Sequence, residues 1–198
     1  PGSTLSFEAL TDERIETDST YDAGTTTQLM WGARSDVGCV RPHNEDSYLV
    51  QSPLFCVCDG MGGHAAGEVA SSIAVETIAK TAPQSADAAR LAAAVEAANA
   101  AVIEAALNGL GKPGRGCTAT CAYIENDTLA IAHVGDSRAY LLHEGTLIRV
   151  TRDHSYVEEL VDAGEITADE ARVHPNRSVI TRALGSDPAM YADHFTLH

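Results

Sequence analysis

The apolar residues of this chain fall into short runs and into longer periodic stretches. Short runs rich in β-branched and aromatic residues, bounded by turn-forming residues, are typical of strands. They predict strands over residues 29–35, 47–50, 54–58, 117–125, 129–135, 139–143, 147–151 and 195–198. Two alanine-rich stretches with apolar residues at helical spacing, 65–81 and 85–108, predict packing helices separated at Pro83, with Ser85 as the cap of the second.

Two shorter helices are predicted towards the C-terminal end. Ser155 or Asp153 can cap a helix over residues 156–163. Thr167 and Glu170 have the spacing of a capping box, in which each residue bonds to the backbone of the other. A second brief helix is therefore expected to begin at this pair.

One predicted strand ends abruptly at a carboxylate. Residues 54–58 are apolar throughout, which predicts a strand covered on both faces, and Asp59 is the first charge after them. Gly60, Gly62 and Gly63 permit backbone angles closed to other residues and let a ligand approach the main chain. Such a turn before a helix is a recurrent metal or phosphate site. Taken alone, it fits a tight turn with a solvated aspartate equally well.

A second acidic cluster lies just upstream of this strand. Glu45 and Asp46 precede the strand at 47–50, and a hairpin through Ser52-Pro53 would bring both carboxylates close to Asp59. Crowded carboxylates repel one another unless a cation neutralises them. Oxygen ligands favour magnesium or manganese over zinc. The two clusters together predict a site for a divalent cation.

Composition excludes several classes of function. With 198 residues, 44% of them hydrophobic, the chain can form one domain with a substantial core. Its formal charge of -15 argues against binding to nucleic acid, which needs clustered basic residues. No apolar run approaches the ~20 residues of a membrane span, and no signal peptide is recognised. We therefore expect neither nucleic-acid binding nor a membrane span in this chain.

The cysteines indicate the compartment. The chain has five cysteines and no Cys-x-x-Cys pair, so we expect reduced, mostly buried thiols and a cytoplasmic location. A disulfide or metal role for Cys56 and Cys58, which would share one face of a strand, is the alternative.

The N-terminal residues differ in composition from the rest. Residues 1–28 contain six acidic residues and one arginine, which predicts an acidic leader without fixed structure. A partner-binding arm is the alternative. The ordered domain is then expected over residues 29–198.

Seven short motifs follow one another in a fixed order. They lie at residues 35–38, 41–46, 59–64, 116–120, 133–140, 153–155, and 174–175 with 180–185. In sequence and order they resemble the motifs of the protein phosphatase 2C family of metal-dependent protein phosphatases, in its bacterial form. The resemblance covers residues 31–185. It implies an α+β fold, a four-layer α/β/β/α sandwich of two mainly antiparallel sheets flanked by helices, with the acidic turns at one end.

The resemblance also implies an activity. It is the hydrolysis of phosphoserine and phosphothreonine on phosphorylated proteins, the substrates of a Ser/Thr kinase. Two ions of Mn²⁺ or Mg²⁺, with a third in bacterial members, would generate a bridging hydroxide that attacks phosphorus. The segment at about 164–178 corresponds to a flap beside the active site that influences substrate choice.

Individual roles are carried over residue by residue. The implied metal ligands are Asp59, which bridges two ions, the Gly60 carbonyl, and Asp136 for the additional ion. Glu45 and Asp46 would hold metal-bound waters. Without the resemblance, Asp136 is at least as well explained as an aspartate that caps a turn.

Arg41 is implied, with Asp59, as a catalytic residue. Its guanidinium would grip two oxygens of the substrate phosphate. An ion pair between Arg41 and Glu45 or Asp46 is the alternative when no substrate is bound.

Two further polar residues are expected to serve the structure. Arg138 is expected to pair with a buried carboxylate, with contact to the substrate as the alternative. His154 is expected to fix a turn by hydrogen bonds, with a proton shuttle as the alternative.

The resemblance fails at the end of the chain. Family members continue into a Ser-Asp-Gly motif and an Asp-Asn pair that complete the two-metal centre, and neither follows residue 185 here. We expect the sequence to be a piece of a longer protein. Two other functions stay open: a catalytically impaired regulatory or phosphoprotein-binding domain of the same fold, and a phosphatase of small molecules.

Overall fold

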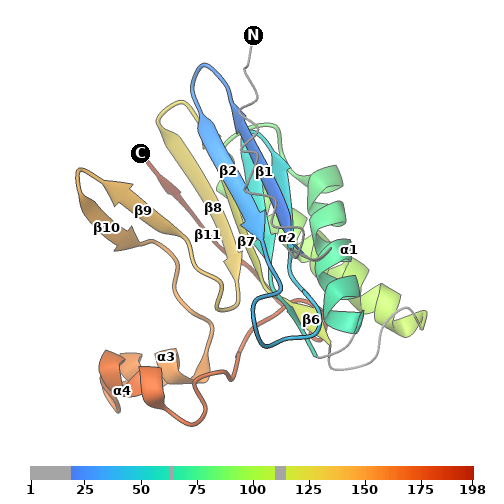
Figure 1. Cartoon of the computed structure of the whole chain (residues 1–198), viewed down its shortest axis with the longest axis vertical. Helices are drawn as coiled ribbons and strands as arrows, with labels where there is room; N and C mark the ends of the chain where they lie inside the picture. The colour runs from blue at the N-terminus through green and yellow to red at the C-terminus, as the bar shows by residue number, and fades with distance from the viewer. Residues whose placement is uncertain (1–18, 63–64, 110–114) are drawn as a thin grey trace.

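The computed structural model describes residues 19–62, 65–109 and 115–198. Its centre is a five-stranded antiparallel sheet in the order β11-β8-β7-β4-β3 (Figure 1). The strands are β3 (Ser47–Gln51), β4 (Leu54–Cys58), β7 (Ala119–Glu125), β8 (Thr128–Val134) and β11 (Asp193–Leu197). Sequence pattern alone predicted each of them to within three residues at either end.

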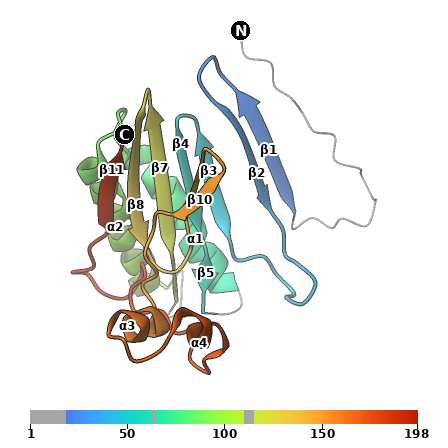
Figure 2. The ribbon, with the colours of Figure 1, turned by 90° about the vertical axis from the view of Figure 1, so that its left-hand side faces the viewer.

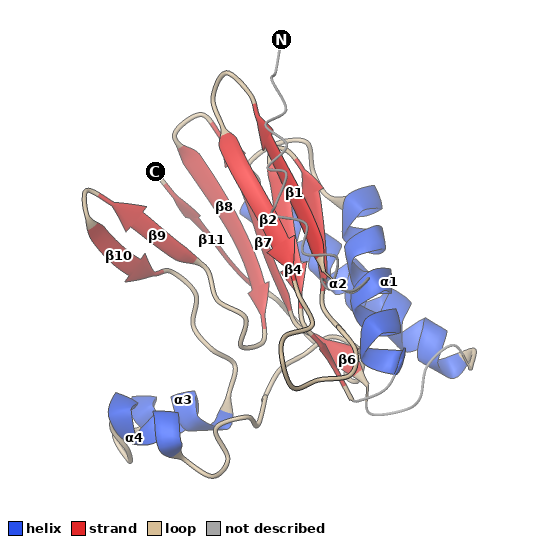
Figure 3. Cartoon of the chain, viewed as in Figure 1, coloured by secondary structure: helices blue, strands red, loops and turns tan. Residues whose placement is uncertain are grey.

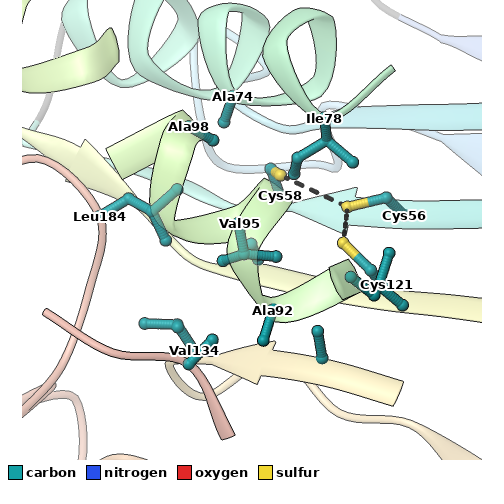
Figure 4. Close-up of a cluster of buried hydrophobic side chains, with 14 of the residues drawn as sticks. Cys56, Cys58, Ala74, Ile78, Ala92, Val95, Ala98, Cys121, Val134 and Leu184 are labelled. Atoms are coloured by element: carbon teal, nitrogen blue, oxygen red, sulfur yellow. Dashed lines mark hydrogen bonds between the residues drawn. The ribbon is translucent and has the colours of Figure 1, made fainter. Parts of the chain in front are cut away.

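Two long helices, α1 (Ala65–Thr81) and α2 (Ala88–Leu107), cover one face of this sheet (Figure 1). The sheet faces these helices with small side chains, against which alanine, valine, leucine and isoleucine side chains of the helices pack (Figure 4). Residues with no exposed surface in this layer are Ala74, Ile78, Leu91, Val95, Ala98, Ala119, Cys121, Ala130, Ala132 and Val134. Small residues on both sides let the two layers approach each other closely.

Three two-stranded ribbons lie around the central sheet. They are β1–β2 (Thr20–Thr25, Met30–Ser35), β5–β6 (Gly60–Met61, Gly116–Cys117) and β9–β10 (Tyr140–His143, Thr146–Arg149). Figure 2 shows α1 and α2 behind the sheet and β9–β10 in front of it, while β1–β2 lies beyond the β3 edge. The helices α3 (Tyr156–Asp162) and α4 (Ala168–Val173) form a separate pair at one end of the molecule (Figure 3).

The predicted class, antiparallel sheets flanked by helices, is confirmed. In the part of the chain that is described, the second sheet is represented by separate ribbons, because β1–β2 and β9–β10 do not pair with each other or with the central sheet.

Strand β1 corrects the expected extent of the leader. The composition of residues 20–25 predicts a segment without fixed structure, yet they pair with β2 over six residues. The Trp31 indole lies over Gly24, where an added Cβ would come within 2.3 Å of the ring. Trp31 also contacts the Phe55 ring at a centroid distance of 6.0 Å. Residues 1–18 lie outside the described residues, so the remainder of the leader stays a prediction.

Three local predictions also need correction. Val57 on β4 is 47% exposed, so the strand is covered on the α1–α2 face but not on both faces. Asp87, not Ser85, caps α2, because its side chain accepts the Arg90 N–H. The single strand predicted over 117–125 is broken at Thr118, which belongs to neither β6 nor β7.

The caps of the short helices are confirmed. The Ser155 side chain accepts the Glu158 N–H at the start of α3. Thr167 and Glu170 form the complete capping box of α4, with bonds of 3.1 and 3.2 Å.

Four of the cysteines gather in the core and all five are free thiols. Cys56 Sγ lies 2.7 Å from Cys121 Sγ and 3.8 Å from Cys58 Sγ (Figure 4). Cys39 is exposed. Hydrogen bonds between neighbouring thiols, and then burial, raise the pKa of the core thiols, which makes them poor nucleophiles. No helix within the described ranges is both long and apolar enough to cross a membrane.

Candidate metal-dependent active site

Two acidic turns meet at one end of the central sheet. The register of β3 and β4 pairs Ser47 with Cys58, so the next residues outward, Asp46 and Asp59, face one another. This is the hairpin arrangement that the sequence predicted. Both aspartates keep surface that solvent or a ligand can reach, although the atoms packed around Asp59 exclude part of the hydration of its carboxyl group.

A third carboxylate approaches from β8. Asp136 follows Gly135, whose φ of +108° turns the chain at the end of that strand. Asp136 is half-buried, and its negative charge is close enough to Asp59 to raise the pKa of Asp59. The ends of three strands in the same sheet therefore bring Asp46, Asp59 and Asp136 towards one place.

The crowding changes the electrostatics of Asp59. Its pKa is raised to about 7, first by loss of hydration, then by a hydrogen bond with the Asp46 carboxyl group and by the charges of Asp46 and Asp136. Arg41 acts in the opposite direction. Loss of hydration and the charge of Asp153 also raise the pKa of Asp136. Carboxylates that converge are expected to raise one another's pKa in this way.

Glu45 has an unsatisfied oxygen beside these acids. Its Oε1 is buried and has no hydrogen-bond partner among the described residues. Its Oε2 lies 3.9 Å from Arg41 Nη1, and the Arg41 side chain is 74% exposed. A buried carboxylate oxygen without a partner costs free energy, and a bound water or a cation with its waters would remove that cost. This contact agrees with the alternative prediction for Arg41, an ion pair with Glu45 or Asp46 when no substrate is bound.

Two hollows adjoin the acids. One, of about 270 Å³, is lined by Asp36, Val37, Arg41, His43, Asn44, Glu45, Asp46, Asp59 and Gly60. The other, of about 370 Å³, shares Asp36, Asp46 and Asp59 with the first and extends to Ser137. A larger hollow of about 540 Å³ lies over β8 and β11, and the three converging acids are not in its wall. Its size therefore does not make it the better candidate.

The donor set fits a hydrated hard cation. No three His, Cys, Asp or Glu side chains among the described residues are placed to hold a metal by themselves. Magnesium is commonly held by one or two carboxylates and several waters. Asp59, a backbone carbonyl and Asp136 could supply such a partial set, and Glu45 Oε1 could accept a hydrogen bond from one of the waters.

Other residues predicted from the sequence brace these turns. Arg138 donates three hydrogen bonds of 2.7 to 3.2 Å to the buried Asp153 carboxylate, as expected. His154 Nδ1 accepts the Gly135 N–H, and its Nε2 lies 2.7 Å from Asp193 Oδ2. His154 thus makes structural hydrogen bonds, as expected, but they join its own turn to the Gly135 turn that carries Asp136, a link that the sequence did not predict.

Sequence reasoning missed two residues at the site. Asp36 lines both hollows, and a bond of 2.7 Å from the Gly38 N–H helps to keep its pKa low. Thr118 bonds to Asp59 and to Ser137 from inside the protein. Both lie in recognised motifs, but neither was assigned a role. Gly63 and His64, which close the predicted glycine turn, lie outside the described residues.

Known proteins with similar sequences point to one family. Residues 30–185 match the model of the family Protein phosphatase 2C. The serine/threonine protein phosphatase PstP of Mycobacterium tuberculosis is 44% identical over 165 residues, which are 82% of this chain and 32% of that protein. The serine/threonine phosphatase stp of Listeria welshimeri is 37% identical over 176 residues, covering 83% of this chain and 70% of that protein. The chain thus spans about a third of the mycobacterial relative.

Solved structures agree. A crystal structure of M. tuberculosis PstP has a TM-score of 0.78 at 38% identity, covering 90% of this chain and 73% of that one. A structure of the PstP catalytic domain in complex with two manganese ions has a TM-score of 0.74 at 36% identity, covering 90% and 72%. Because the family model spans most of the sequence and the Listeria relative is matched over more than two thirds of its length, the chain belongs to the protein phosphatase 2C family.

Proposed function

We propose that this chain carries the active site of a metal-dependent phosphatase that acts on phosphoserine and phosphothreonine in proteins. The observation that carries the proposal is the convergence of Asp46, Asp59 and Asp136 beside an exposed arginine. Carboxylates would attract divalent cations, and the guanidinium would bind the phosphate dianion. The names of the relatives, serine/threonine phosphatases, support this substrate class.

In this proposal, Asp59, the Gly60 carbonyl and Asp136 hold Mn²⁺ or Mg²⁺, as two or three ions. Glu45 and Asp46 bond to the waters of those ions. Divalent cations in such a site supply a nucleophilic water at neutral pH and offset the charge of the phosphate. The two manganese ions named for the PstP catalytic domain favour manganese.

Arg41 is the residue proposed to bind the substrate phosphate. Its contact to Glu45 is long, at 3.9 Å, and most of its side chain is in solvent. Little free energy therefore holds it to Glu45. It can turn to a phosphate and form the paired, charge-assisted hydrogen bonds that a guanidinium makes with two oxygens.

The substrate is proposed to be a folded or extended phosphoprotein, the product of a Ser/Thr kinase. Asp46 and Asp59 line open hollows at the surface, which leave room for a large partner. The segment at about 164–178, which includes α4, is the proposed flap and the source of specificity. The free core thiols are consistent with the proposed cytoplasmic location.

Manganese titration calorimetry with a parallel hydrolysis assay tests the proposal. We expect Mn²⁺ binding that is abolished by EDTA, and Mn²⁺-dependent release of phosphate from phosphoserine and phosphothreonine peptides. A phosphotyrosine peptide and nitrophenyl phosphate are the matched substrates. Turnover of nitrophenyl phosphate alone would support the small-molecule phosphatase, and phosphopeptide binding without turnover would support the regulatory domain.

Replacement of Arg41 by alanine is expected to raise the Michaelis constant for a phosphopeptide by about 10- to 100-fold, the loss of one or two charge-assisted hydrogen bonds. The turnover number should change less, because the group binds the phosphate before and during reaction. Steady-state kinetics measures both. Arg90→Ala is the control, since that side chain is equally exposed, at 77%, and lies on α2. A loss confined to the turnover number would contradict the assigned role.

A further inference from the structure

Thr118 occupies a break between two strands directly beneath the acidic site. It lies between β6 and β7 and has no exposed surface. A buried hydroxyl needs hydrogen-bond partners, and those partners show what the residue holds in place.

On one side, Thr118 binds the backbone of Asp59 twice. The Asp59 N–H donates to Thr118 Oγ1 at 3.0 Å, and the Thr118 N–H donates to the Asp59 carbonyl at 2.9 Å. Both polar groups of the Asp59 main chain are therefore hydrogen-bonded to Thr118. These bonds fix the position of the Asp59 Cα, from which the carboxylate extends.

On the other side, Thr118 contacts both neighbours of Asp136. Its Oγ1 lies 2.7 Å from Ser137 Oγ, in hydrogen-bond contact. Its methyl group packs on Gly135, where an added Cβ would lie 2.5 Å from Thr118 Cγ2. Asp136 is the residue between these two contacts. One threonine side chain thus touches the two turns that carry the converging carboxylates.

We propose that Thr118 is a positioning residue that sets the separation of Asp59 and Asp136 and thereby the affinity of the site for divalent cations. This inference rests on the proposed function, because it needs a cation at these two carboxylates. The hydroxyl fixes Asp59 and the Ser137 side of the second turn, while the methyl group fixes the Gly135 side. Residues that orient a metal ligand typically change metal affinity by about 10- to 100-fold when they are removed.

Two variants separate the contributions of the hydroxyl and the methyl group. Thr118→Val keeps the shape and removes the hydroxyl, whereas Thr118→Ser keeps the hydroxyl and removes the methyl group. We expect Thr118→Val to weaken Mn²⁺ binding by about 10-fold or more in titration calorimetry. We expect the affinity of Thr118→Ser to remain close to that of the original chain, because the hydroxyl carries both side-chain hydrogen bonds. The rise in melting temperature on addition of Mn²⁺ should therefore be smaller for Thr118→Val than for the original chain, and nearly unchanged for Thr118→Ser.

Thr151→Val is the matched control. Thr151 is also buried, with 3% of its surface exposed, and its Oγ1 also accepts a backbone N–H, from Ala139 at 3.0 Å. Removal of the Thr151 hydroxyl should lower the melting temperature in EDTA, and removal of the Thr118 hydroxyl should do the same. Thr151→Val should, however, leave the dissociation constant for Mn²⁺ unchanged.

The outcomes are distinguishable. If the original chain binds Mn²⁺ and Thr118→Val binds it equally well, Thr118 is only a structural residue and the inference is overturned. Equal weakening of binding by Thr151→Val would overturn it as well, since the effect would then follow stability and not position. Absence of Mn²⁺ binding by the original chain would instead contradict the proposed function, and the inference would fall with it.

Discussion

Asp59→Asn is expected to weaken Mn²⁺ binding by more than about 100-fold. Loss of a residue that only hydrogen-bonds to a metal ligand costs about 10- to 100-fold, and loss of the ligand itself should cost more. An amide has no charge and one acceptor oxygen, so it would hold a divalent cation less tightly than a carboxylate would. Titration calorimetry measures the affinity directly, and Mn²⁺-dependent phosphate release from a phosphopeptide should disappear with it. The side chains have nearly the same shape, so the change tests charge and not packing.

The same substitution should stabilise the metal-free protein. In the folded chain the pKa of Asp59 is raised to about 7, against an unfolded value near ~3.9. Between these two values the folded state binds more protons than the unfolded state, so Asp59 lowers stability as the pH rises from about 4 to 7. Asparagine does not titrate. The melting temperature of Asp59→Asn in EDTA should therefore exceed that of the original chain above pH 7 and equal it below about pH 4.

Asp127→Asn is the control for both effects, since Asp127 lies in the exposed turn between β7 and β8. It should alter neither Mn²⁺ affinity nor the pH dependence of melting. Unchanged Mn²⁺ affinity in Asp59→Asn would contradict the assignment of Asp59 as a ligand. A lower melting temperature at pH 8 would contradict the electrostatic account of the metal-free site.

Local pattern was sufficient to predict most of the central sheet. Strands β3 and β4 are a hairpin with a short turn, so their register, and with it the meeting of Asp46 and Asp59, follows from neighbouring residues. Strand β1 could not be predicted in this way. Its residues are polar or small, and it is ordered by pairing with β2 and by the Trp31 ring over Gly24.

The remaining parts of the site depend on contacts between distant segments. Asp136 reaches the other acids only because β7 lies between β4 and β8 in the sheet, and spacing along the chain does not contain that order. Its role was inferred from family resemblance. Thr118 was missed because its importance comes from the break between β6 and β7, whereas the alternation of residues over 117–125 predicted one strand.

The tight packing around Gly60 links the acidic site to the helical layer. An added Cβ at this position would lie 2.3 Å from the Gly67 carbonyl oxygen and 2.4 Å from the Glu45 carbonyl oxygen. Both contacts are to backbone, one in α1 and one in the acidic cluster, so neither can move aside by a side-chain rotation. Gly67 is itself close to Glu45, where an added Cβ would lie 2.9 Å from Oε1. The start of α1, the Gly60 turn and Glu45 therefore form one packed unit.

Gly60→Ala is accordingly expected to destabilise the protein by about 3 kcal/mol, the upper end of the cost of overpacking. For a domain of this size that corresponds to a fall of about 6 to 12 °C in melting temperature. Mn²⁺ affinity should fall as well, because relief of the clash moves either Glu45 or the turn that follows Asp59. Gly32→Ala is the matched control, since its nearest atom to an added Cβ, the Asp22 carbonyl oxygen, is 3.8 Å away. If the two variants melt at the same temperature in EDTA, Gly60 is not the close contact that joins the site to α1, and the position of Asp59 must be fixed from the Thr118 side alone.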